Sequence, residues 1–79
     1  MSRNNYSEKK EREKTERKEK ARIEKLEARI IKNENALKQY HEQLAIEANR
    51  QDFVQMNDLS QKISLVKQEI ENLYREYAG

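Results

Sequence analysis

Apolar residues recur along this chain at alternating steps of three and four residues, which is the spacing of a coiled-coil seam. One run begins at Ile23 and ends at Leu44, and a second begins at Met56 and ends at Tyr77. Each run predicts a helix that buries one stripe of side chains. We interpret the polar Asn33 as a layer that fixes the pairing register at some cost in stability. The predicted seam consists of Ile23, Leu26, Ile30, Asn33, Leu37, Tyr40 and Leu44 in the first run, and of Met56, Leu59, Ile63, Val66, Ile70, Leu73 and Tyr77 in the second.

The stretch between the two runs, EANRQDFVQM at residues 47–56, breaks this pattern. A straight helix would need apolar residues where the chain has Gln51 and Gln55. If the chain folds back instead, the residue numbers of opposed seam positions add up to 99 or 100, as for Leu44 with Met56. A parallel dimer would not require this mirror relation. The pattern therefore predicts an antiparallel hairpin within one chain, which we expect to be a monomer.

The predicted fold is all-α: a two-helix antiparallel coiled-coil hairpin with a charged, partly frayed N-terminal helical extension. We expect the extension, a basic linker, at residues 1–20 and the hairpin at residues 21–79. Within the hairpin, the first helix is expected to end at about residue 47, the turn to cover 48–52, and the second helix to span about 53–78.

Several polar residues suit the expected helix ends. Ser7 can cap the start of the extension, which then frays toward Met1. Asn49 tolerates a left-handed backbone, which would end the first helix. Asp52, followed three residues later by Gln55, is typical of a capping box at the start of the second helix.

The composition fits this fold and disfavours several other classes of protein. Of the 79 residues, 41% are charged, none is Pro, Cys or Trp, and the single Gly is the last residue. Turn-rich β architectures and disulfide frameworks are therefore disfavoured. No apolar run approaches the ~20 residues of a membrane-spanning helix, and the N-terminus lacks the apolar stretch of a signal peptide. We expect a cytoplasmic protein without membrane contact.

Charge is unevenly distributed along the chain. The leader, residues 1–22, has nine basic and five acidic residues and a net charge of +4, whereas residues 23–79 have eight basic and ten acidic residues and a net charge of −2. On a helix the leader presents a winding basic stripe, which could follow a phosphate backbone. The alternative is a solvated Glu/Lys helix that binds nothing. The stripe would consist of Lys10, Lys14, Lys18 and Arg22, with Lys18, Lys25 and Lys32 forming a second one.

Motifs of catalysis are missing from the sequence. It has no phosphate-binding glycine loop, no Cys/His cluster and no histidine paired with a nucleophile. The single histidine, His41, lies beside the seam and is expected at the surface. A two-helix hairpin also offers no cavity that would exclude water from a reaction. We therefore expect no catalytic residue, no metal site and no cofactor.

Three segments form a recognisable pattern: ARIEKLEARIIKNENAL at residues 21–37, DFVQMNDLSQKI at 52–63 and EIENLYREY at 69–77. Together they resemble the C-terminal coiled-coil domain of ABC-F ATPases. That group includes the Uup-like proteins and ribosome-associated factors of translation and antibiotic resistance. The leader segment NNYSEKKEREK is similar to the linker that follows the second ATPase domain of these proteins. The chain departs from the pattern at Tyr77, where Trp is common, and it lacks the usual Pro near the turn.

The resemblance implies a non-catalytic accessory domain of a larger ATP-binding protein, which contacts ribosomal RNA or DNA. Together with the polarised charge, it makes exposed cations the expected nucleic-acid-binding residues, acting on phosphates rather than bases. The alternative is a protein-interaction or spacer coiled coil that positions the ATPase domains of the parent chain. The expected docking sites are then Ile31 and Leu65 outside the seam, or the tip of the hairpin. The candidate nucleic-acid-binding residues are Lys9, Lys10, Arg12, Lys14, Arg17, Lys18, Arg22, Lys25, Arg29, Lys32 and Arg50.

Overall fold

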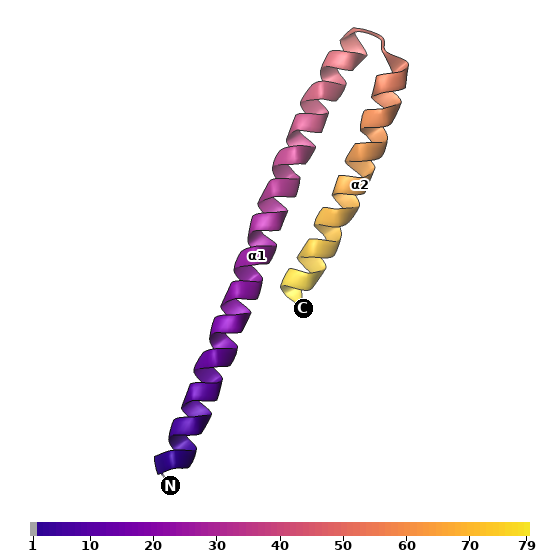
Figure 1. Ribbon diagram of the computed structural model, residues 1–79. Coiled ribbons are helices and arrows are strands. Elements are labelled where there is room, and N and C mark those ends of the chain that lie inside the picture. The colour runs from indigo at the N-terminus through magenta and orange to yellow at the C-terminus, as the bar shows by residue number, and fades with distance from the viewer. Residues whose placement is uncertain (1) are drawn as a thin grey trace.

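Two helices joined by a tight turn make up the computed structural model, which describes the backbone of residues 2–79 and the side chains from Ser7 onward. Helix α1 spans Ser2–Asn49 and helix α2 spans Phe53–Ala78. They lie antiparallel, and α1 runs far past the C-terminal end of α2, so the molecule measures 74 × 15 × 13 Å (Figure 1). The predicted all-α hairpin is confirmed.

The N-terminal extension continues α1 without a break. The helix begins at Ser2 and not at Ser7, so the predicted cap at Ser7 is wrong. The first residues contain neither Pro nor Gly, and nothing in them ends a helix that is already formed downstream. The predicted fraying at Met1 lies outside the described residues.

The core is one narrow seam between the two helices. Its most enclosed side chain is Leu73, which is 1% exposed and packs in a cluster with Leu26 and Ile30. Leu59 and Ile63 are also buried, nearer the turn. Tyr77, at the end of the second run, is 44% exposed because the helix ends just beyond it. Half-buried side chains complete the seam: Ile23, Asn33, Leu37, Tyr40, Leu44, Met56, Val66 and Ile70.

Polar contacts between the helices show how they are aligned. The Arg29 guanidinium lies 3.1 Å from the Glu69 carboxylate across the hairpin. The Tyr77 hydroxyl donates to Glu27 at 3.3 Å in the same part of the molecule. By contrast, the half-buried Asn33 amide donates to the Arg29 carbonyl of its own helix at 2.8 Å. Its hydrogen bond is therefore local and does not cross the seam.

The turn ends α1 with a Schellman arrangement. The Asp52 amide donates to the Glu47 carbonyl at 3.0 Å, and the Gln51 amide donates to the Ala48 carbonyl at 3.1 Å. Gln51 carries the left-handed backbone, with φ of 57°. The prediction that Asn49 takes this conformation is wrong, because Asn49 is still helical and the left-handed position falls two residues later.

Helix α2 begins with the predicted cap. The Asp52 carboxylate accepts a hydrogen bond from the backbone amide of Gln55 at 3.1 Å. The amides in the first turn of a helix have no carbonyl partner within the helix, and this bond provides one of them with an acceptor. The cap at Asp52 is thus confirmed. Just before the turn, Glu47 is only 6% exposed, and its carboxylate accepts a hydrogen bond from the side-chain amide of Gln43 at 3.0 Å. Together these bonds give the turn a defined shape.

Candidate functional site

The leader projects beyond α2 as a single helix (Figure 1). All its described side chains are exposed. A hollow on this helix is lined by Lys10, Lys14, Arg17, Lys18 and Ala21. Three of these residues belong to the basic stripe expected from the sequence. Ala21 is the one small residue among these long cationic side chains.

Other hollows on the leader are lined by charges of both signs. Glu13 and Glu16 line one of them together with Arg17 and Lys20, and Glu11 lines another with Lys10 and Lys14. The hollow beside Ala21 differs from these because it contains no carboxylate. The helix therefore presents one face where a hollow is lined by cations without a carboxylate, next to faces that also contain carboxylates.

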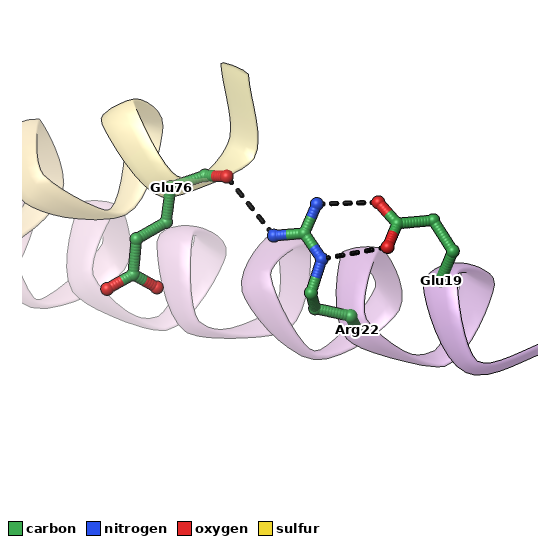
Figure 2. Close-up of polar contacts among 3 residues, drawn as sticks. All are labelled: Glu19, Arg22 and Glu76. Atoms are coloured by element: carbon green, nitrogen blue, oxygen red, sulfur yellow. Dashed lines mark hydrogen bonds and ion pairs between the residues drawn. The ribbon is translucent and has the colours of Figure 1, made fainter. Parts of the chain in front are cut away.

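Arg22, the fourth residue of the expected stripe, already forms hydrogen bonds with other residues of the chain. It donates to the two oxygens of the Glu19 carboxylate at 3.2 and 2.6 Å, and to the Glu76 carbonyl of α2 at 3.2 Å (Figure 2). Arginine suits this place because the last carbonyls of a helix have no partner in the helix itself. The hydrogen bond with Arg22 lowers the pKa of Glu19, and the same bond raises the pKa of Arg22. Arg22 thus ties the end of α2 to α1.

Two further candidate cations also have partners in the hairpin. Arg29 pairs with Glu69 across the seam, and Arg50 at the turn lies 3.7 Å from the Glu47 carboxylate. Arg17 donates weakly to the Glu13 carbonyl at 3.4 Å. Among residues 7–79, neither a hydrogen bond nor an ion pair engages the side chains of Lys9, Arg12, Lys14, Lys18, Lys25 and Lys32.

A second feature, which the sequence reasoning missed, lies where the end of α2 packs on α1. An open groove of about 330 Å³ is lined there by Glu27, Ile30, Ile31, Glu34, Tyr74 and Tyr77. The Tyr74 hydroxyl donates to the Glu34 carboxylate at 2.7 Å, and the Tyr77 hydroxyl donates to Glu27. The signal in the sequence is a pair of glutamates one heptad apart on α1, with two tyrosines three apart on α2.

Ionisation of Tyr74 should report on this groove. Its hydrogen bond to Glu34 raises the pKa of the phenol, because ionisation would break the bond and place two negative charges together. We expect the Glu34→Gln variant to lower this pKa. The absorbance of the phenolate as a function of pH measures it, and Tyr74→Phe, which lacks this phenol, identifies the contribution of Tyr74. Since the folded-state pKa is raised, the bond stabilises the fold below the pKa of an unfolded tyrosine and loses this effect as pH rises through the folded-state value. An unchanged pKa in Glu34→Gln would contradict the contact.

Neither metal binding nor a membrane span has support in the part of the chain that the structure describes. Within it, no group of three or more Asp, Glu or His side chains is placed to hold a metal ion. Neither α1 nor α2 has an apolar stretch long enough to cross a membrane.

Comparison with known proteins identifies a family. A protein family described as ABC transporter C-terminal domain matches residues 14–78, which include the hairpin up to residue 78 and the end of the leader from residue 14. No curated protein and no solved structure matches the chain.

Proposed function

Because this chain belongs to the ABC transporter C-terminal domain family, it is an accessory domain of an ABC protein, and we propose that it contacts the phosphate backbone of nucleic acid. The domain itself is proposed to be non-catalytic, with ATP hydrolysis carried out by ATPase domains elsewhere in the parent protein. The resemblance to the ABC-F group supports a cytoplasmic setting and places ribosomal RNA or DNA first among the polyanions to be tested.

The observation that carries this proposal is the hollow lined by Lys10, Lys14, Arg17 and Lys18. Its cations stand on one helical face without a carboxylate among the lining residues. Such a surface favours the binding of a nucleic-acid backbone, because each phosphate that it neutralises releases a condensed counterion. Contacts with phosphates carry no sequence information, so we expect binding that is independent of sequence.

The described structure narrows the set of candidate binding residues. Arg22, Arg29 and Arg50 are each already paired with a carboxylate of the chain, and phosphate would have to compete with these carboxylates. Lys25 and Lys32 have no such partner and could extend the basic surface toward the hairpin. We therefore propose the leader as the main contact and the hairpin arginines as positioning residues.

A second candidate function is a spacer or protein-docking coiled coil that positions the ATPase domains. Two large apolar side chains outside the seam support it, since Ile31 is 59% exposed and Leu65 is 67% exposed. These two lie on different helices, however, so they do not form one docking surface, and an apolar residue exposed by itself, as Leu65 is, is common. The charge of the leader favours nucleic acid as the first partner to test.

Replacing three leader cations should weaken nucleic-acid binding and flatten its salt dependence. We expect Lys14→Gln/Arg17→Gln/Lys18→Gln to reduce the slope of log affinity against log salt by about two to three for duplex DNA, because each phosphate contact contributes ~0.9. Fluorescence anisotropy with labelled duplex DNA and a labelled RNA hairpin, from low to moderate salt, measures this slope.

The matched control is Lys38→Gln/Lys62→Gln/Lys67→Gln, which removes the same charge from the hairpin. It should lower the affinity through net charge but leave most of the slope in place. Equal losses in the two variants would contradict the leader as the binding surface. A salt-independent affinity of the unmodified chain would contradict contacts with phosphates. No binding even at low salt would contradict nucleic-acid binding altogether and favour the spacer function.

A further inference from the structure

We propose that the groove between Glu27, Ile31, Glu34, Tyr74 and Tyr77 docks an arginine-bearing basic segment of a protein partner. This surface has the opposite charge to the leader and lies further along α1, so the inference does not rest on nucleic-acid binding. It concerns a second contact, made by the part of the hairpin where α2 ends.

The carboxylates of the groove are held in place but remain available. Each phenol hydroxyl donates to one of them, Tyr74 to Glu34 and Tyr77 to Glu27. A carboxylate has about four acceptor positions, so one donor leaves most of its capacity free. Within the described residues, neither Glu27 nor Glu34 forms an ion pair. The groove therefore presents two fixed negative charges that the hairpin does not neutralise.

The surface between these charges is apolar and aromatic. Ile31 is 59% exposed, and Tyr74 and Tyr77 are 48% and 44% exposed. A side chain that fills this surface must combine an apolar stem with a cationic end. Arginine fits best because its stem packs on apolar groups, its planar head stacks on aromatic faces, and its fork of N–H groups matches a carboxylate.

The spacing of the glutamates indicates a partner with two cations. Glu27 and Glu34 are one heptad apart on α1, which separates them by about 10 Å along the helix axis. Two arginines one heptad apart on a partner helix have the same separation. A nucleic acid does not fit here, because its phosphates would meet carboxylates.

The test uses a synthetic helical peptide built from Ala and Gln, with two arginines one heptad apart and a fluorescent label. Saturable binding to the chain, with shifts of the Tyr74 and Tyr77 ring signals in NMR spectra, is the expected result. A control peptide with Gln in place of both arginines should not bind. Equal binding of the control peptide, or arginine-peptide binding that leaves both tyrosine signals unmoved, would overturn the proposal.

Variants of the chain then locate the contact. We expect Glu27→Gln/Glu34→Gln to weaken peptide binding by at least about tenfold, since it removes two charge-assisted contacts. The matched control Glu42→Gln/Glu71→Gln removes the same charge outside the groove and should keep most of the affinity. Equal weakening by both variants would overturn the groove as the site. So would sedimentation data showing a dimer that only the groove variant dissociates, because a second copy of the chain would then be the occupant.

The same variants separate this inference from the proposed function. Glu27→Gln/Glu34→Gln should bind duplex DNA at least as well as the unmodified chain, because it removes negative charge. If this variant lost both peptide and DNA binding with unchanged helicity by circular dichroism, the two surfaces would not be independent and the proposal as stated would fail.

Discussion

Leu73→Ala should remove most of the stability of the hairpin. Leu73 is 1% exposed, and its side chain joins Leu26 and Ile30 in the buried cluster at the open end of the seam. Truncating a buried leucine to alanine costs about 2–5 kcal/mol, because transfer free energy is lost and a cavity remains. A domain of this size rarely has more than about 3–5 kcal/mol in total. We therefore expect partial unfolding of α2 even without denaturant.

Urea denaturation followed by circular dichroism measures this effect, with Leu65→Ala as the control. Leu65 is a leucine on the same helix but is 67% exposed, so its truncation should change the free energy of unfolding by less than about 0.5 kcal/mol. Both substitutions introduce the same residue into α2, so propensity cancels between them. Similar midpoints for the two variants would contradict the packing of α2 on α1.

The hairpin could be predicted from the sequence because its determinants are periodic. Two runs of apolar residues that mirror each other about the break at 47–56 leave one way to bury both stripes within a single chain. The cap at Asp52 was predictable as well, since a carboxylate three residues before Gln55 suits a helix start. These features depend on residue type and spacing alone.

The end of α1 was harder to place because several polar residues could have stopped the helix. Asn49 has the stronger intrinsic tendency for a left-handed backbone, yet Gln51 adopts it. The left-handed position is set by two hydrogen bonds, in which the backbone amides of Asp52 and Gln51 donate to the Glu47 and Ala48 carbonyls. This pattern requires the left-handed residue to lie just before Asp52. Tertiary pairing and the cap of α2 therefore override the local preference of Asn49.

The basic surface could be predicted only in part. Charge along the leader is visible in the sequence, and the hollow lined by Lys10, Lys14 and Lys18 gathers residues of the expected stripe. That Arg22 is tied to Glu19 and the end of α2 depends on where α2 stops against α1. The groove of Tyr74 and Tyr77 depends on the same alignment and was missed for the same reason. A sequence shows which charges exist, whereas the register decides which of them are already paired.

The turn provides a second strong test, because neighbouring substitutions should act in opposite directions. Gln51→Gly should stabilise the hairpin by about 0.5–1 kcal/mol, since glycine adopts a φ of 57° without the steric cost that a side chain carries. Asp52→Ala should destabilise it by about 1 kcal/mol, because the Gln55 amide loses the carboxylate that caps α2. The free energies of unfolding of the two variants, measured by urea denaturation, should then differ by the sum of both effects.

A third variant, Gln51→Ala, separates the backbone from the side chain at this position. Alanine pays the same steric cost as glutamine in the left-handed region, so its free energy of unfolding should stay close to that of the unmodified chain. If Gln51→Gly and Gln51→Ala had equal stability, the turn in solution would not use a left-handed residue at this position. If Asp52→Ala were neutral, the start of α2 would not depend on the observed cap. The turn connects the two halves of the seam, so these small changes also set how firmly α2 is held against α1, and thus how well the groove at its far end is formed.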